Sequence, residues 1–278
     1  MHTLIAQGPT LTITEAHDIA EKLSADLEAR DGYFTMSRDE TPSTAQLEEL
    51  RQLHRADINI LPSDFDARSV KLLITDMDST FINIECIDEI ADYMGVKPQV
   101  AAITEAAMRG ELDFAGSLTK RVALLKGLDV AALEDVYRER LRLNPGGEAM
   151  IAGLKKSGIK IGLVSGGFTM FTDKLKARYG LDFARANTLD ITADKLTGRV
   201  LGEIIGAERK AAFLSELCRA LDIQPSQVVA MGDGANDLLM MQRAGLSIAY
   251  HAKPKVQDQA ATRLNYCGLE GVLGLLQL

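Results

Sequence analysis

Two carboxylates stand directly after a short apolar run, and this placement constrains the fold more than any other feature. The run covers residues 70–74, and the carboxylates are Asp76 and Asp78. A short apolar run of this kind is typical of a strand buried on both faces of a parallel sheet. Because open α/β sheets bind ligands outside the carboxyl ends of their strands, the sequence predicts an α/β fold with the acidic pair at a binding edge. Taken alone, the pair would be read as a turn that caps the next segment.

Three further polar positions favour a site over a turn. A second apolar run, residues 159–164, ends at Ser165, and a third, residues 228–231, ends in the segment 232–237. Lys210 lies between them, at the start of a segment with apolar residues at helical spacing. Each position alone has an ordinary explanation, as a strand-to-helix turn, a hairpin or a solvated lysine. At the strand ends of one parallel sheet, they predict a single site.

Phosphoryl transfer is the chemistry that requires these groups together. A transferring phosphoryl group needs a positioned nucleophile, cations and directed N–H donors. Asp76 fits the nucleophile, because an aspartate can split hydrolysis into formation and breakdown of an aspartyl phosphate. Asp78 fits the acid that protonates the leaving oxygen and the base that then takes a proton from water.

The other polar groups complete such a site. Asp233 and Asp76 offer the oxygen ligands that a hard cation such as Mg²⁺ prefers. Lys210, the Ser165 hydroxyl and the backbone N–H of Gly166 would neutralise and hold the phosphate oxygens.

The four clusters resemble, in order, the four motifs of the haloacid dehalogenase superfamily of phosphotransferases. They read D-M-D-S-T at 76–80, S-G-G at 165–167, Lys210, and G-D-G-A-N-D at 232–237. From about residue 70 to the C-terminus the chain is similar to the phosphoserine phosphatase family, most distinctively in D-M-D-S-T-F-I-N-I-E-C-I-D-E-I-A and V-S-G-G-F. The resemblance implies a Rossmann-like core. It also implies hydrolysis of O-phospho-L-serine to L-serine and phosphate, the last step of serine biosynthesis.

The resemblance further implies roles for single residues. It makes Asp76 the nucleophile and Asp78 the acid/base. It implies Mg²⁺ held by the Asp76 carboxylate, the main-chain carbonyl of Asp78 and Asp233. Asn236 and Asp237 would support the phosphate and the metal.

The resemblance also assigns recognition of the amino acid to four residues of the segment 83–143. Glu85 would face the ammonium of the substrate and Arg121 its carboxylate, while Met108 and Phe114 would close over it as apolar residues. Charge agrees, since a phosphorylated amino acid requires one acid and one base beyond the phosphate site. Spacing alone favours plainer readings, in which Arg121 is a solvated helix residue and Glu85 a helix cap.

Three parts are expected along the chain. Residues 1–65 form a small α+β unit with strands near 3–6 and 32–36 and helices over 14–27 and 44–54. Residues 71–82 and 144–278 form the core, with a hairpin protruding at 187–201. Residues 83–143 form a helical cap inserted after the first core strand.

The N-terminal unit has two readings. Phosphoserine phosphatases often carry a regulatory domain of the ACT type, but that fold needs more strands than residues 1–65 indicate. One is a truncated or degenerate ACT-like domain, and the other is a docking element that covers the sheet edge or mediates contact between the copies of a homodimer.

Charge and composition bear on the possible partners, the number of domains and the cellular compartment. Residues 1–70 carry 13 acidic and 6 basic side chains and the rest 26 and 25, so no basic surface suggests nucleic acid. The length of 278 residues suggests about two domains. Three cysteines without paired spacing, no signal-like start and no long apolar stretch favour a cytoplasmic protein that is not bound to a membrane.

Two other functions remain open from sequence. One is a capped phosphatase or phosphotransferase for a neighbouring substrate, for example one that moves the phosphate to another hydroxyl. The other is a non-catalytic amino-acid sensor, which would not need Asp76 and Asp78 together with Lys210 and Asp233.

Overall fold

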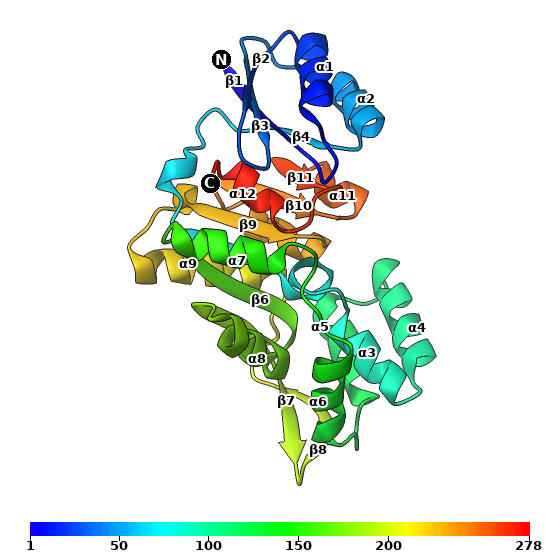
Figure 1. The fold of residues 1–278 in the computed structure, drawn as a ribbon. Coiled ribbons are helices and arrows are strands. Elements are labelled where there is room, and N and C mark those ends of the chain that lie inside the picture. The colour runs from blue at the N-terminus through cyan, green and yellow to red at the C-terminus, as the bar shows by residue number, and fades with distance from the viewer.

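The fold contains two sheets (Figure 1), seen in a computed structural model that describes residues 1–107 and 109–278. A four-stranded antiparallel sheet with the order β2-β3-β1-β4 occupies the N-terminal part of the chain. A seven-stranded sheet with the order β11-β10-β9-β5-β6-β7-β8 forms the rest, and it is parallel except for the pair β7 and β8. The expected α/β class with a parallel core sheet is confirmed.

The N-terminal sheet and its helices have the following bounds: β1 His2–Gln7, α1 Ile13–Leu23, β2 Asp26–Ala29, β3 Phe34–Arg38, α2 Thr44–His54 and β4 Asp57–Ile60. The seven-stranded sheet comprises β5 Leu72–Thr75, β6 Lys160–Phe168, β7 Phe183–Thr192, β8 Lys195–Leu201, β9 Val228–Gly232, β10 Leu246–Tyr250 and β11 Thr262–Leu264. The helices beside it are α7 Gly147–Lys156, α8 Thr169–Tyr179, α9 Ala207–Leu221, α10 Leu238–Met241, α11 Pro254–Gln257 and α12 Gly271–Leu275. Between β5 and α7 lie a single π-helical turn, Met77–Phe81, and the helices α3 Cys86–Tyr93, α4 Lys97–Met108, α5 Phe114–Ala123 and α6 Val130–Glu139.

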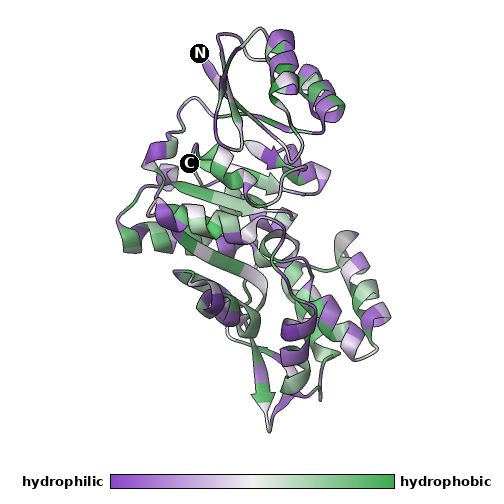
Figure 2. Cartoon of the chain, viewed as in Figure 1, coloured by the Kyte–Doolittle hydropathy of each residue, from purple (hydrophilic) through white to green (hydrophobic). Residues whose placement is uncertain are grey.

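Both faces of the seven-stranded sheet are buried at its centre, which explains why β5, β9 and β10 read as apolar runs. Leu72 and Ile74 of β5 pack into one hydrophobic cluster with α9, whereas Leu73 packs into another with α7 and α8. Successive side chains of a strand point to opposite faces, so a strand covered on both sides must be apolar throughout. The central strands are accordingly mostly hydrophobic, whereas the outer helices show polar residues on their exposed side (Figure 2).

The order of the strands places the sequence motifs beside one another. β5 lies in the middle of the sheet, with β6 on one side and β9 on the other, and all three run parallel. Helices α3 to α6 leave the carboxyl end of β5 and return before α7, lying beyond that edge of the sheet (Figure 1). Two antiparallel segments connect them to the sheet, and these meet at a bridge between Ile82 and Leu143.

The N-terminal part holds more strands than the sequence indicated. The expectation of two strands is wrong, because β2 and β4 were not recognised and the helix expected over 14–27 ends at Leu23. Ser24 follows in the left-handed conformation, with φ of 50°, which ends the helix and starts the turn into β2. The order of elements is therefore βαββαβ, with α1 and α2 packed on one face of the sheet.

β4 contacts β11 at the edge of the seven-stranded sheet through side chains that bond to backbone. The buried carboxylate of Asp57 accepts backbone N–H donors from Asn265 at 2.7 Å, Tyr266 at 3.1 Å and Cys267 at 2.8 Å. Burial raises the pKa of the Asp57 carboxyl above its usual value even though these donors lower it. Asn59 adds a reciprocal pair with the backbone of Arg263.

Two further expectations concern membrane-spanning helices and Met108. Among residues 1–107 and 109–278, none of the helices combines the length and apolar character that a membrane span requires. Met108, expected to close over the substrate, lies outside the described residues.

The contact between β4 and the seven-stranded sheet predicts a stability effect. Asp57→Asn replaces an oxygen that only accepts hydrogen bonds by an amide N–H₂, which then faces backbone donors. We expect the free energy of unfolding to fall by about 1–3 kcal/mol, the typical penalty of a buried group that loses its partners. Urea titration measures it, with Asp39→Asn as an exposed control. Equal stability of the two variants would contradict this account.

Candidate active site

The catalytic candidates begin where β5 ends. Asp76 continues the strand, since its N–H donates to the carbonyl of Met231 in β9 at 2.9 Å, and only 5% of the residue is exposed. The π-helical turn then reverses the chain, with Asp78 at ψ of 134° and Ser79 at φ of 55°. Both aspartates therefore lie at the carboxyl edge of the sheet, as the sequence predicted.

Lys210 lies behind Asp76 and is fully buried. It stands in the first turns of α9, and its Nζ donates to Asp76 Oδ1 and, at 2.7 Å, to Asp237 Oδ1. Burial opposes a charge on Lys210, but the two carboxylates outweigh it and raise the pKa of the ammonium group above its usual value. Lys210 is therefore a permanent cation that holds the carboxylate of Asp76 in place.

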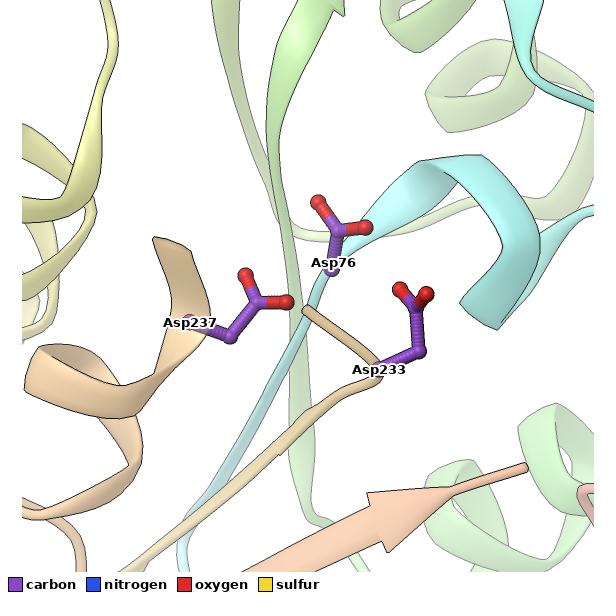
Figure 3. Close-up of side chains that lie close together, drawn as sticks. All are labelled: Asp76, Asp233 and Asp237. Carbon is purple, nitrogen blue, oxygen red and sulfur yellow. The ribbon is translucent and has the colours of Figure 1, made fainter. Parts of the chain in front are cut away.

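Three carboxylates converge beside this ammonium (Figure 3). One oxygen from each of Asp76, Asp233 and Asp237 lies within 4.8 Å of the others. Burial raises the pKa of Asp76 well above its usual value, and its carboxylate neighbours add to this while Lys210 opposes it. One buried lysine thus does not compensate the negative charge, so the cluster fits a bound cation.

The hydrogen bonds divide the three carboxylates into two kinds. Asp237 uses both oxygens, one for Lys210 and one for the N–H of Gly234 at 3.1 Å. Asp233 accepts the Thr80 hydroxyl at 3.0 Å through Oδ1. Among the described residues, the second oxygens of Asp76 and Asp233 receive no hydrogen bond and are free to bind a cation. That Asp76 and Asp233 are metal ligands and that Asp237 supports them stays a prediction.

Asp78 is held by two elements. Its Oδ1 accepts the N–H of Cys86 at the start of α3 at 2.8 Å, and its Oδ2 accepts the hydroxyl of Ser165 at 3.0 Å. The Ser165 oxygen in turn accepts the N–H of Gly167 at 2.7 Å. A Cβ on Gly167 would lie 2.7 Å from Asp78 Oδ2, so a larger residue there would displace this carboxylate. In this structure Ser165 therefore orients Asp78, a role that the sequence did not suggest.

A pocket of about 200 Å³ opens over these groups, small enough to favour a small metabolite over a large ligand. Asp76, Asp78 and Asp233 lie at its base, together with Gly166 and Asn236. Three further motif residues are fully buried behind the base of the pocket: Ser165, Lys210 and Asp237. The structure thus brings the residues of all four motifs together.

The wall opposite the sheet comes from α3 and α5. Glu85, Phe114 and Arg121 all line the pocket there. Glu85 precedes α3 but makes no capping bond with its side chain, which instead accepts the Ser79 hydroxyl at 2.7 Å. Burial, together with the charge of Asp78, raises the pKa of the Glu85 carboxyl to about 7. Glu85 thus occupies the N-cap position of α3, as spacing suggested, but its side chain faces the pocket and does not cap the helix.

Arg121 is half-buried, and its guanidinium group makes no hydrogen bond to the described residues. Its Nε is shielded from solvent and has no hydrogen-bond partner within residues 1–107 and 109–278. Burial lowers the pKa of Arg121, although the charges of Asp88 and Glu85 counteract this. A half-buried guanidinium whose Nε lacks a partner, placed in a pocket wall, fits an anionic ligand. It is not the solvated helix residue that spacing alone favoured.

Sequence reasoning missed several residues of this site. Lys253 lines the pocket after β10, and the rule that strand ends carry ligand-binding groups would have found it. Ile87 and Leu118 supply apolar wall and carry no sequence signal that separates them from core residues. Asn187 also went unassigned, although its amide bonds to the carbonyl of Gly166 and the N–H of Ile205, both at 2.8 Å.

Comparisons with known proteins agree on one family. The model of the haloacid dehalogenase-like hydrolases matches residues 70–245. The phosphoserine phosphatase of Polaromonas sp. is 52% identical over 225 residues, which cover 79% of this chain and 95% of that protein.

Two crystal structures extend the likeness to nearly the whole chain. A haloacid dehalogenase family hydrolase from Salmonella enterica serovar Typhi has a TM-score of 0.90 at 35% identity, covering 100% of this chain and 99% of its own. A probable phosphoserine phosphatase from Vibrio cholerae has a TM-score of 0.86 at 40% identity, covering 99% and 86%. Because the family motifs, the identity to a nearly full-length relative and the fold agree, the chain belongs to the phosphoserine phosphatases of the haloacid dehalogenase-like hydrolase family.

Proposed function

We propose that the protein hydrolyses O-phospho-L-serine to L-serine and phosphate, with Mg²⁺ as cofactor, in the last step of serine biosynthesis. The observation that carries this is one pocket with an aspartate nucleophile at its base and an unpaired Arg121 beside Glu85 in its opposite wall. Phosphoserine presents a phosphate, a carboxylate and an ammonium, and the pocket offers a complement for each. Family membership supports the same substrate.

In the first half of the reaction the Asp76 carboxylate attacks phosphorus, while the bond from Lys210 to its Oδ1 holds it in place. The bond between phosphorus and the seryl oxygen breaks, and Asp78 gives its proton to that oxygen as serine leaves. In the second half Asp78 takes a proton from water, which attacks the aspartyl phosphate. Phosphate leaves and Asp76 is regenerated.

The remaining polar groups act on the charge of the phosphoryl oxygens. Lys210 compensates their charge from behind Asp76, and the backbone of Gly166 orients them, with Asn236 at the pocket wall. Ser165 keeps Asp78 turned toward the leaving oxygen through its 3.0 Å bond. Such positioning is most of what phosphoryl transfer needs from a protein.

Mg²⁺ would be held by Asp76, Asp233 and the main-chain carbonyl of Asp78, with Asp237 orienting the set. Free oxygens on Asp76 and Asp233 and the excess of carboxylates over lysine support this assignment. The ion supplies charge compensation that lets an anionic nucleophile approach an anionic phosphate.

The chain is divided, in this proposal, into an N-terminal unit over 1–65, a core over 71–82 and 144–278, and a cap over 83–143. The cap contributes Phe114 and Arg121 to the pocket and excludes water while the aspartyl phosphate forms. Three buried, unpaired cysteines support a reducing, cytoplasmic setting. Dimer formation through the N-terminal unit belongs to the same proposal.

The nucleophile is tested first. Asp76→Asn keeps the shape of the side chain but removes the attacking carboxylate, so we expect phosphate release from phosphoserine to fall by at least about 10³-fold. Colorimetric phosphate release measures it, with Asp31→Asn, an exposed aspartate far from the pocket, as control. Turnover by Asp76→Asn protein near the wild-type rate would exclude this mechanism.

The metal is tested by removal and return. After chelation with EDTA and dialysis we expect phosphate release to be lost, and added Mg²⁺ to restore it. Tight binding would also raise the melting temperature, because a ligand that binds only the native state stabilises it. Full activity in thoroughly chelated protein would rule out a metal-dependent site.

Specificity is tested at Arg121. Arg121→Lys keeps the charge but loses the planar fork that matches a carboxylate, so KM for phosphoserine should rise more than kcat falls. A phosphate ester without carboxylate or ammonium is the control substrate. Equal losses on both substrates would mean that Arg121 is structural and that the substrate assignment is wrong.

The pH dependence is tested at Glu85. With a pKa of about 7, the Glu85 carboxyl is ionised above pH 7 and protonated below it. Because only the ionised form pairs with ammonium, KM for phosphoserine should rise as the pH falls from 7 to 6, by up to about tenfold per unit. Glu85→Gln should abolish this slope. The same pH series is measured on a phosphate ester that keeps the carboxylate but lacks the ammonium, because ionisation of the phosphate affects both substrates equally. An identical slope of KM against pH on this ester would refute the pairing of Glu85 with the ammonium.

A further inference from the structure

Asn144 bonds to the turn that carries the catalytic aspartates. Its Nδ2 donates to the carbonyls of Thr80 at 2.8 Å and Ile82 at 3.1 Å, with that of Ser79 at 3.4 Å. Its backbone N–H donates to the carbonyl of Phe81 at 3.1 Å. One residue thus supplies donors to four consecutive carbonyls.

These carbonyls need outside donors because the turn is irregular. Asp78 has ψ of 134° inside the turn, and Ser79 has φ of 55°, a left-handed conformation that is unfavourable for a non-glycine residue. Backbone groups that leave a regular helix must find other partners. The amide of Asn144 supplies them at the point of strain.

The same turn sets the position of three site residues. Asp76 precedes it and Asp78 lies within it, while the Thr80 hydroxyl donates to Asp233 at 3.0 Å. The carbonyl of Thr80 receives the shortest bond from Asn144. A loosened turn would therefore move the acid/base and the partner of Asp233 together.

We propose that Asn144 is a positioning residue for phosphoryl transfer, whose amide holds the turn 77–81 in the strained conformation that aims Asp78 at the leaving oxygen. The inference rests on the proposed function, and it deepens it by assigning a residue that touches neither substrate nor metal. It predicts a kcat effect, since a misaimed acid/base slows chemistry without changing the groups that bind the amino acid.

Asn144 also lies where the cap segment, residues 83–143, returns to the core. Leu143, the residue before it, pairs with Ile82 where the chain returns from α6, so Asn144 joins the returning segment to the catalytic turn. Asn83 offers a matched control in the same connection. Its Oδ1 accepts the N–H of Arg142 at 2.8 Å, and its side chain makes no hydrogen bond to the turn.

The experiment compares Asn144→Ala, Asn144→Asp and Asn83→Ala with the wild type. Asn144→Asp keeps the shape of the side chain but removes both N–H donors. We expect kcat on phosphoserine to fall on the order of 10²-fold in both Asn144 variants, as for an ångström-scale misplacement. KM should stay within a few-fold, and the loss should be smaller on an aryl phosphate, whose leaving group needs little protonation. Asn83→Ala should resemble the wild type.

A second measurement reports on the turn itself. Amide hydrogen exchange should accelerate in the segment 77–86 of both Asn144 variants but not of Asn83→Ala. A wild-type rate in Asn144→Asp, or exchange unchanged from wild type, would overturn the positioning role. Equal losses on phosphoserine and the aryl phosphate would do so as well. If the wild type releases no phosphate from phosphoserine, the proposed function fails instead, and the exchange data still decide whether Asn144 holds the turn.

Discussion

The ammonium group of Lys210 is the charge on which the rest of the site depends. It is fully buried and shared between Asp76 and Asp237, which come from the ends of β5 and β9. A buried ion pair that loses one partner is strongly destabilising, because the remaining charge cannot be solvated. The three side chains therefore lock two strands and α9 into one arrangement, and the nucleophile cannot move without disturbing the core.

Around this fixed group the catalytic turn is held from outside. Cys86 and Ser165 bond the two oxygens of Asp78, and Asn144 bonds the carbonyls of the turn. These partners come from α3, from β6 and from the segment that returns from α6, so parts distant in sequence converge on one strained loop. Strain of this kind persists only where the surroundings over-determine it. The site is thus preorganised by many weak bonds around one strong ionic group.

The N-terminal part shows where local sequence signals fail. β2 has only four residues, Asp-Leu-Glu-Ala, and follows a helix whose periodic pattern continues into it, so the sequence favours a longer helix. β4 is equally short and was missed, although the helix before it ends at His54 as expected. Strand pairing decides both cases, because β2 hydrogen-bonds to β3 and β4 hydrogen-bonds to β1. A segment of four residues is too short for its own sequence to predict such pairing. The buried Asp57 then joins this sheet to the loop after β11.

The sequence by itself determined the α/β class, the parallel core strands and the residues of the four motifs, because apolar runs covered on both faces and polar groups at strand ends are local patterns. It also pointed to Glu85 and Arg121, but only through family resemblance, since spacing left their plainer readings ahead. Only the tertiary structure decided that the Arg121 guanidinium is unpaired, that Ser165 bonds Asp78 and that Asn144 bonds the catalytic turn. These contacts join residues 64 to 87 positions apart, and no local pattern encodes a hydrogen bond between segments that meet only when the sheet is assembled.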